Sequence, residues 1–294
     1  MISRFLNPKN DLTFKRIFGS EQNKDILIHF LNDIFARTTN PIEDVEFIKP
    51  IMDPEKKELR VSIIDVLCKD FEGNRFIIEM QCAVDTAFIK RAQYYASRVY
   101  CSQRTKGTEY KDLKSVTFLA ILDEMLFPDK KEYMSYHVML DKNTLEHDLQ
   151  DFSFSFLELA KFNKKPHELK TMVEKWAYFF KHAEDTTKAE LAAIVGSDCI
   201  IEKAFEALSE YNYTPEEIEY YDNLERSEDM RRTLLDDYAA KGKEEGIAIG
   251  EAKGKAEAKK ASVLKMHSKN LSAETIAEFV DLSIDKVKAI IAES

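Results

Sequence analysis

The stretch that decides the fold is residues 61–81, VSIIDVLCKDFEGNRFIIEMQ. Two runs of strand-forming residues flank a polar turn, DFEGN, in which Gly73 supplies the backbone angle that such a turn needs. The stretch therefore predicts an antiparallel hairpin. Asp65 interrupts the first apolar run and Glu79 interrupts the second. Burying a carboxylate in a sheet is unfavourable unless it has a partner.

The turn also predicts the register of the two strands. If DFEGN is a five-residue loop centred on Glu72, Asp65 lies directly opposite Glu79. Such cross-strand partners have Cβ atoms about 4.5–5.5 Å apart. Side chains alternate along a strand, so Gln81 lies on the same face as Glu79. A shift of one residue would instead place the two acids on opposite faces.

Two interpretations of the acids remain open on spacing alone. Carboxylates that face each other repel, and a divalent cation would remove that repulsion. Mg²⁺ prefers oxygen ligands and commonly uses one or two carboxylates, while substrate phosphates complete its shell. Asp65, Glu79 and Gln81 would then form a phosphodiester-hydrolysing site. Alternatively, the acids lie on the solvent face of a half-exposed sheet.

The segment after the hairpin, residues 87–114, concentrates positive charge in a protein whose net charge is −10. Its periodicity predicts a helix on which Arg91, Tyr95 and Arg98 share one face, where they could follow a phosphate backbone. Lys90 stands next to them in the sequence. The alternative is an ordinary solvated helix whose tyrosines cover the sheet, although we favour a functional role for Arg91.

Periodicity along the chain predicts an α/β core followed by helices. Two helices separated by Gly19 are expected within residues 11–36, and a third over 86–105. Besides the hairpin, strands are expected over 44–49, 115–123, 135–140 and 152–159. After Pro166 only helices are expected, over 166–184, 198–210 and 215–240. Helices on both faces of a mixed sheet follow from this order.

The C-terminal part has a pattern of its own. In KGKEEGIAIGEAKGKAEAKK, residues 241–260, glycine recurs at every fourth position. A helix would carry these glycines along one slowly turning face that a second helix, such as that of another copy, can approach closely. Each glycine costs about 1 kcal/mol relative to alanine, so a flexible charged linker is the alternative. Residues 272–292 have the outline of a helix-turn-helix, as a DNA reader or a packing cap.

These signals predict three parts. They are a sheet-containing core at 1–165, a helical region at 166–240 and a tail at 241–294 that holds the glycine-spaced helix and the short helix pair.

Composition narrows the class of protein. Of 294 residues, 44% are hydrophobic and 33% are charged, which is typical of a globular protein. The acidic balance argues against a general nucleic-acid packaging role. Four scattered cysteines match no zinc pattern and fit a reducing, cytoplasmic compartment. We find no apolar core of a signal peptide, no run that could span a membrane and no nucleophile-elbow motif.

Three ordered motifs resemble those of the PD-(D/E)XK nuclease family transposases, also called Rpn recombination-promoting nucleases. The motifs are NDLTFKRIFGSEQNKDILIHFLNDIF, IIDVLCKDFEGNRFIIEMQ, and FIKRAQYYASRVY followed by KGTEYKDLKSV. The resemblance covers nearly the whole chain, including the glycine-spaced segment. It implies a restriction-endonuclease-like core, with a central mixed sheet flanked by helices, that cuts DNA with a divalent metal.

The resemblance implies roles for individual residues. Asp65 matches the aspartate of the motif and Glu79 its second acid, so these two would bind the metal. Gln81 stands where the wider superfamily has lysine, and its neutral amide can orient water but brings no positive charge. Asp11, on the first helix, is a candidate for an additional acid. Three residues are candidates for the missing cation: Lys15, Lys90 and Arg91.

The sequence therefore predicts a Mg²⁺-dependent DNA endonuclease, with Mn²⁺ as a possible substitute. Its sequence specificity would be low, and its role would be linked to recombination or mobile elements. The DNA backbone would be held by Lys90, Arg91, Tyr95 and Arg98, and the C-terminal region would form a homodimer. The rival interpretation is a protein of the same fold that binds DNA or assembles without effective catalysis.

Overall fold

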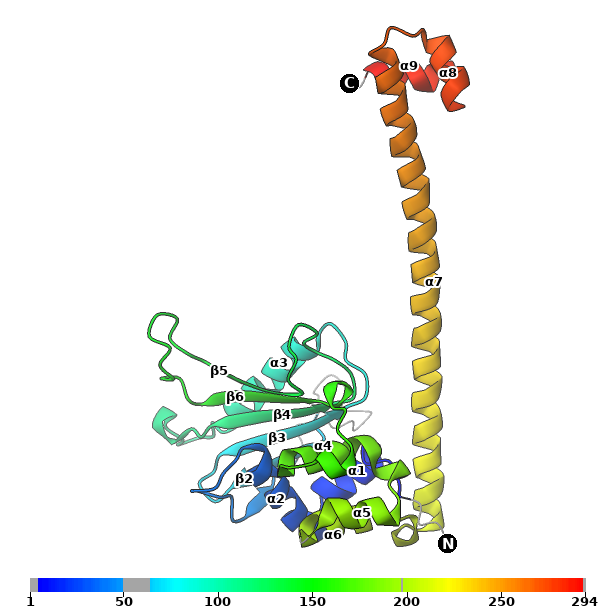
Figure 1. The fold of residues 1–294 in the computed structure, drawn as a ribbon. Helices are drawn as coiled ribbons and strands as arrows, with labels where there is room; N and C mark the ends of the chain where they lie inside the picture. Colours follow the sequence, from blue (N-terminus) through cyan, green and yellow to red (C-terminus); the bar gives the residue numbers. More distant parts are fainter. Residues whose placement is uncertain (1–4, 50–63, 197, 293–294) are drawn as a thin grey trace. The chain divides into compact units, whose positions relative to one another are not determined.

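The computed structural model describes residues 5–49, 64–196 and 198–292. Its contacts divide the chain into two units, Met1–Leu224 and Glu225–Ser294. The first unit holds a sheet with helices packed on it, and every element described in the second unit is a helix (Figure 1). Residues 61–63, at the start of the predicted hairpin, lie outside the described residues.

A mixed sheet of six described strands forms the centre of the first unit. In chain order the strands are β1 (Val45–Phe47), β2 (Val66–Asp70), β3 (Arg75–Gln81), β4 (Val116–Leu122), β5 (Met134–Val138) and β6 (Phe152–Glu158). Their order across the sheet is β1-β2-β3-β4-β6-β5. The central strands β3, β4 and β6 run parallel, whereas the other neighbours pair antiparallel. The predicted mixed sheet is confirmed.

Helices cover both faces of this sheet, as the sequence predicts (Figure 1). One face packs on α3 (Phe88–Cys101). The helices of the opposite face are α1 (Asp11–Phe18), α2 (Lys24–Ile34), α4 (Met172–His182), α5 (Lys188–Val195) and α6 (Cys199–Ala207). Strand β3 shows why both faces are covered, because Phe76 and Ile78 enter one core and Ile77 enters the other. Alternating side chains that are all apolar require two apolar layers.

The two N-terminal helices form where the sequence predicts them. Asn10 caps α1 by accepting a hydrogen bond from the backbone N–H of Leu12, and Gly19 follows the last residue of α1. A Cβ atom on Gly19 would lie 2.9 Å from the carbonyl oxygen of Lys15 and 3.4 Å from Cγ2 of Val66. The missing side chain of Gly19 therefore lets the end of α1 lie close to the start of β2.

The helices after residue 165 share a core with the sheet. Trp176 of α4 is fully buried and packs edge-on against Phe30 of α2, with ring centroids 5.2 Å apart. The same hydrophobic cluster contains Ile78 of β3 and Leu119 of β4. One apolar core thus contains residues from both sides of residue 165. The domain boundary at that residue stays a prediction.

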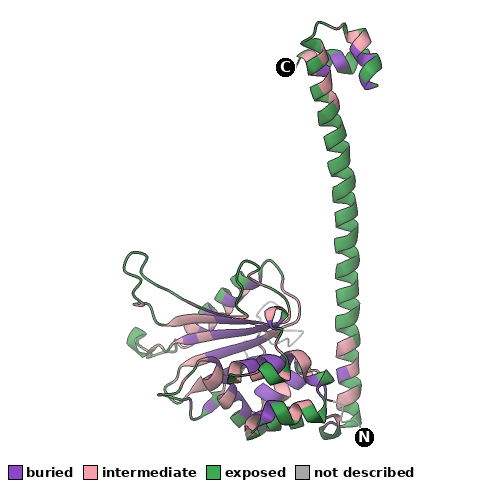
Figure 2. Cartoon of the chain, viewed as in Figure 1, coloured by how far each residue is buried: buried purple, intermediate pink, exposed green. Residues whose placement is uncertain are grey.

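The C-terminal helices also follow the sequence. The glycine-spaced segment belongs to one continuous helix, α7 (Pro215–His267), so the flexible-linker alternative is wrong. Figure 2 shows that most of α7 is exposed. Two short helices follow, α8 (Ala273–Val280) and α9 (Ile284–Ala292), which confirms the predicted pair. Val263, Ile276 and Val287 form a small core of their own in this second unit.

Candidate functional site

The β2–β3 hairpin has the register that its turn predicts. Val66 lies opposite Ile78, and Gly73 in the turn has a φ of 91°. Strand β2 begins at Val66, so Asp65 is the residue just before the paired segment. The Oδ2 atom of Asp65 accepts a hydrogen bond of 2.9 Å from the backbone N–H of Met80. The backbone N–H of Asp65 donates in turn to the carboxylate of Glu79, so the two acids adjoin at the open end of the hairpin.

Burial makes this pair of acids electrostatically unfavourable. Only 7% of Glu79 is exposed, and its Oε1 atom has no hydrogen-bond partner among the residues described. Burial and the charge of Asp65 raise the pKa of Glu79 well above its usual value, against the opposing charges of Arg91 and Lys15. Burial also raises the pKa of Asp65 to about 6. Both carboxyl groups would therefore be stabilised in their ionised form by a nearby cation.

Helix α1 brings two further charged residues to these acids. The Nζ atom of Lys15 forms an ion pair of 2.6 Å with Oδ1 of Asp11, one helical turn earlier. Burial lowers the pKa of Lys15, but the hydrogen bond and charge of Asp11 outweigh it and the net shift is upward. The charge of Lys15 lowers the pKa of both Asp65 and Glu79, while that of Asp11 raises the pKa of Asp65. The four predicted residues therefore form one electrostatic cluster.

Gln81, the last residue of β3, contacts α3 through its side chain. The Nη2 atom of Arg91 donates a hydrogen bond of 3.1 Å to Oε1 of Gln81. The Nη1 atom of the same guanidinium donates at 2.7 Å to Oδ2 of Asp85. Sequence reasoning missed Asp85. The available signal was an acid shortly before the start of a helix, a position from which carboxylates often bind the first backbone N–H groups.

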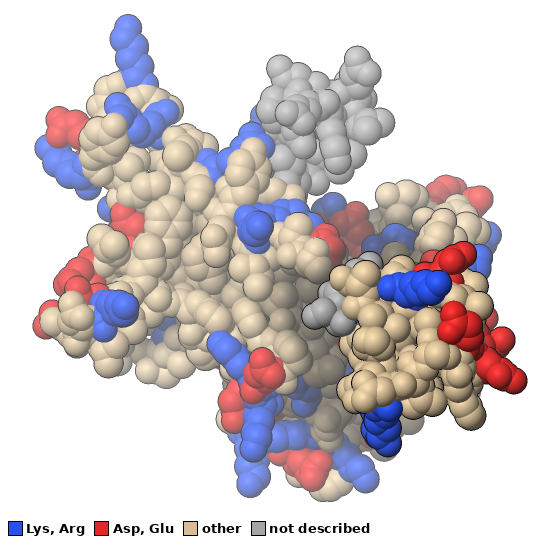
Figure 3. Space-filling view, turned by 90° about the horizontal axis from the view of Figure 1, so that it is seen from above, with Lys and Arg blue, Asp and Glu red and all other residues tan. Residues whose placement is uncertain are grey.

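The remaining predicted residues lie along α3. Lys90 is exposed, whereas Tyr95 is half-buried and packs against the core between α3 and the sheet. The guanidinium carbon of Arg98 lies 5.7 Å from the ring centroid of Tyr94. On the face visible in Figure 3, the described Lys and Arg side chains are scattered, many beside acids, and form no continuous basic surface. The role of these residues in DNA binding stays a prediction.

The acids of the site bear on whether a metal ion could bind here. In the described ranges, no group of three or more His, Cys, Asp and Glu residues is arranged to hold a metal. Asp65 and Glu79 nevertheless offer two adjoining carboxylates, and Glu79 Oε1 is buried without a partner in that part of the chain. A Mg²⁺ ion with waters and substrate phosphates needs only one or two carboxylates, so this pair fits.

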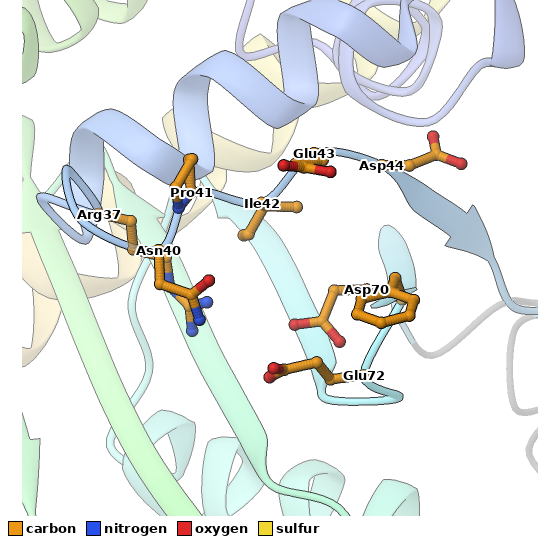
Figure 4. A pocket seen from close by; sticks show the side chains of 9 residues that line it. Arg37, Asn40, Pro41, Ile42, Glu43, Asp44, Asp70 and Glu72 are labelled. Atoms are coloured by element: carbon orange, nitrogen blue, oxygen red, sulfur yellow. The ribbon is translucent and has the colours of Figure 1, made fainter.

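A pocket lies at the other end of the same hairpin (Figure 4). It is lined by Arg37, Asn40, Pro41, Ile42, Glu43, Asp44, Asp70, Phe71 and Glu72. Asp70 and Glu72 belong to the turn that closes the hairpin, whereas Asp65 and Glu79 lie at its open end. The pocket is therefore separate from the pair of acids.

A family model described as "PD-(D/E)XK nuclease family transposase" matches residues 8–237. The chain belongs to this family. No curated protein and no solved structure was found to match it. The matched range contains Asp65, Glu79 and every other residue of the site described above. The mixed sheet with its flanking helices is consistent with the restriction-endonuclease-like fold of PD-(D/E)XK proteins.

Membership in the PD-(D/E)XK family indicates a nuclease-type hydrolase whose function is linked to transposition, with DNA as the implied substrate. Nucleases of this family typically use divalent metals, which agrees with the chemistry of the adjoining carboxylates. Among the described residues, no helix has both the length and the apolar surface that a membrane span requires.

Proposed function

We propose that this protein is a Mg²⁺-dependent DNA endonuclease that hydrolyses phosphodiester bonds with low sequence specificity. One observation carries the proposal, namely that Asp65 and Glu79 adjoin at the open end of a hairpin with both pKa values raised. Holding two buried acids together is unfavourable by itself. A bound cation would stabilise both carboxylates in their ionised form, and the same cation could serve phosphodiester hydrolysis.

Asp65 and Glu79 are the proposed metal ligands, with Mn²⁺ as a substitute for Mg²⁺. Such an ion, when bound, supplies Lewis-acid chemistry by lowering the pKa of water and offsetting phosphate charge. The buried Oε1 atom of Glu79 supports this assignment, because in the described part of the chain it lacks any hydrogen-bond partner.

Three further residues of the site, Gln81, Lys15 and Asp11, would assist hydrolysis of the phosphodiester bond. Hydrolysis forms a bond between a water oxygen and phosphorus and breaks one P–O ester bond, while water loses a proton and the leaving oxygen gains one. Gln81 would orient the attacking water. Lys15 is well placed to supply positive charge on the α1 side, because its field reaches Asp65 and Glu79. Asp11 would hold Lys15 through their ion pair and serve as the additional acid.

Helix α3 would hold the DNA backbone through Lys90, Arg91, Tyr95 and Arg98. Contacts to phosphates carry no sequence information, so low specificity and strong salt dependence follow. Membership in a transposase family supports a role in recombination or with mobile elements. The four cysteines are all free thiols, which supports a reducing, cytoplasmic compartment.

We also propose that α7 mediates homodimerisation. Seven of its large hydrophobic side chains are exposed: Tyr220, Met230, Leu234, Leu235, Tyr238, Ile247 and Ile249. A Cβ atom added at each of its four glycines would meet nothing within 4 Å in the described chain. Residues 215–240 contain nine acidic and three basic residues, whereas 241–267 contain four acidic residues and seven lysines. An antiparallel pair of α7 helices would match these opposite charges.

The proposed activity can be tested by incubating supercoiled plasmid with the purified protein in Mg²⁺, in Mn²⁺ and in EDTA. The Asp65→Asn and Glu79→Gln variants should lose metal-dependent nicking. Glu46→Gln is the matched control, because Glu46 is an exposed acid of the same sheet that pairs with Lys69. Equal nicking by all proteins would mean that the site is misassigned. A wild type that shifts DNA on a gel but never nicks it would favour the rival, non-catalytic function.

A further inference from the structure

The side chain of Arg91 is fixed on three sides. Its Nη1 and Nη2 atoms donate to Asp85 and Gln81, at 2.7 Å and 3.1 Å. Its guanidinium carbon lies 5.2 Å from the ring centroid of Phe88, a buried residue in the first turn of α3. Both terminal nitrogens therefore have partners within the chain, and a guanidinium held in this way has little freedom to rotate.

Asp85 is in turn held by the backbone at the start of α3. Its Oδ1 atom accepts a hydrogen bond of 2.8 Å from the N–H of Ala87, and its carbonyl oxygen accepts one of 3.1 Å from the N–H of Phe88. The second carboxylate oxygen is left for Arg91. The helix start thus fixes Asp85, Asp85 fixes Arg91, and Arg91 reaches the amide of Gln81.

This contact determines which way the Gln81 amide faces. Arginine has only donors, so the amide atom that faces Arg91 must be the carbonyl oxygen. The two N–H donors of the amide therefore face away from Arg91. Glu79 and Gln81 are two residues apart in β3, so their side chains leave the sheet on the same face.

From this geometry we infer that Asp85 and Arg91 are positioning residues that hold Gln81 as a hydrogen-bond donor to the phosphate. The inference rests on the proposed nuclease function and changes the role of Gln81 within it. An amide with its oxygen bound to Arg91 would have to share that oxygen between the guanidinium and the attacking water, whereas both of its N–H groups face away from Arg91. Its N–H groups can instead stabilise the negative charge that develops on a non-bridging phosphate oxygen.

The same arrangement accounts for the absent lysine. A lysine at position 81 would bring donors and a positive charge in one side chain. Here Gln81 supplies the donors, and Arg91, bound to the oxygen of the same amide, supplies the positive charge. The hydrogen bond from Arg91 also polarises the amide and so strengthens its N–H donors. The charge of Arg91 also reaches Glu79. Arg91 therefore serves the reaction through Gln81, in addition to any contact that it makes with DNA.

The decisive variant is Gln81→Glu. A carboxylate at this position keeps, and strengthens, the hydrogen bond from Arg91, but it offers no N–H donor. We expect kcat for plasmid nicking to fall by about 10²-fold, the usual loss when one preorganised donor is removed. If Gln81 instead accepts a hydrogen bond from water, the glutamate variant should be at least as active as the wild type. That result would overturn the inference.

A double-mutant cycle tests the positioning role. Gln81→Ala and Arg91→Ala should each lower kcat by about 10²-fold, and the double variant should be no slower than either single variant. For Gln81→Ala, the affinity for a DNA duplex, measured by fluorescence anisotropy in Ca²⁺, should change far less than kcat, so the comparison of kcat values is made at saturating DNA. Losses that multiply to about 10⁴-fold would mean that the two residues act independently, which contradicts the inference.

Asp85→Asn provides a milder test, because an amide at this position binds Arg91 more weakly and without charge. We expect a smaller loss of kcat than for Arg91→Ala, with unchanged DNA affinity. Asp25→Asn is the matched control, since Asp25 is an exposed acid that forms a 2.6 Å ion pair with Lys203 on another face. Thermal unfolding of each variant separates misfolding from a catalytic effect.

The outcomes separate this inference from the proposed function. A wild type without metal-dependent nicking overturns the nuclease proposal, and the inference falls with it. A wild type that nicks DNA, together with an active Gln81→Glu variant or an additive cycle, overturns the inference alone.

Discussion

Two buried glutamates lie in the last three residues of parallel strands in this protein, and their surroundings differ. Glu158 of β6 is fully buried, and its Oε1 atom accepts hydrogen bonds of 2.7 Å and 3.0 Å from the N–H groups of Leu126 and Phe127. Its Oε2 atom pairs with Lys161 at 2.7 Å. Glu79 of β3 is buried beside a second acid, and one of its oxygens has no partner in the described chain.

The comparison separates an acid with a structural role from one for which we propose a function. The hydrogen bonds to Glu158 satisfy its charge within the fold and hold the segment after β4. For Glu79, burial and the charge of Asp65 outweigh the opposing charges of Arg91 and Lys15, and the Oε1 atom has no hydrogen-bond partner in the described chain. Burial alone is therefore no sign of function, whereas burial with an unmatched charge is.

The largest expected difference between the two glutamates is in activity. Glu79→Gln should lower nicking by about 10³-fold, because it removes a proposed metal ligand and the stabilisation of several kcal/mol that the ion gives the transition state. Glu158→Gln, assayed at a temperature where it is folded, should keep most of the wild-type kcat. A quantitative plasmid assay with active protein normalised to its folded fraction makes this measurement. Similar losses of kcat in Glu79→Gln and Glu158→Gln would contradict the proposal that only Glu79 takes part in the reaction.

Stability should change in the opposite order. Glu158→Gln leaves Lys161 buried without its counter-charge, and breaking such a pair costs about 3–5 kcal/mol. Glu79→Gln removes a buried charge without a cation and should leave the free energy of unfolding unchanged or increase it. Urea unfolding in EDTA compares the two directly. A destabilised Glu79→Gln variant would show that Glu79, too, has a structural role.

A smaller effect should appear in the pH dependence of metal binding. Burial raises the pKa of Asp65 to about 6, so the folded protein holds this proton more tightly than the unfolded chain. The free energy of unfolding therefore falls as the pH rises from about 4 towards 6. Above that range Asp65 is ionised in both states, and the loss of stability does not grow further. Mg²⁺ should raise the melting temperature more at about pH 7.5 than at about pH 5.

Two results would contradict this expectation. An equal shift in melting temperature at both pH values would mean that Asp65 is not part of the metal site. An Asp65→Asn variant that Mg²⁺ stabilises as much as the wild type at about pH 7.5 would lead to the same conclusion.

The smallest effect concerns an acid that already has a partner. The Oδ2 atom of Asp33 lies 2.7 Å from Nδ1 of His29, and Asp198 lies 3.7 Å from the other ring nitrogen. The hydrogen bond to Asp33 outweighs burial and raises the pKa of His29. This stabilisation, about 1 kcal/mol or less, is fully present below pH 6.5 or so and is lost as the pH rises through the higher folded pKa. His29→Gln should remove this part of the pH dependence, which urea unfolding can measure.

The backbone of the site could be predicted from sequence because its determinants are local. A five-residue turn with Gly73 fixes the register of the hairpin, and the register places Asp65 beside Glu79. Helix α5 was not predicted, since KAELAAIV is short and has little separation of apolar and polar faces.

Side-chain contacts between distant segments could not be predicted in this way. Nothing in the spacing of Lys15 and Asp65 indicates that α1 lies against the start of β2, because this depends on how the core packs around Gly19. The link from Asp85 through Arg91 to Gln81 likewise depends on rotamers that a sequence pattern does not specify. The unmatched oxygen of Glu79 is a property of the packed structure alone.

The hydrogen bond from Met80 to the Asp65 carboxylate has a consequence for mutagenesis. Since β2 begins only at Val66, a side chain supplies the acceptor for this backbone N–H at the open end of the hairpin. Asp65 thus also holds the open end of the hairpin together. Truncation to alanine would let this end fray and would disturb Glu79, so any defect would mix lost chemistry with lost architecture. The side-chain oxygen of an asparagine can still accept the hydrogen bond from Met80, so Asp65→Asn removes the charge and keeps this contact.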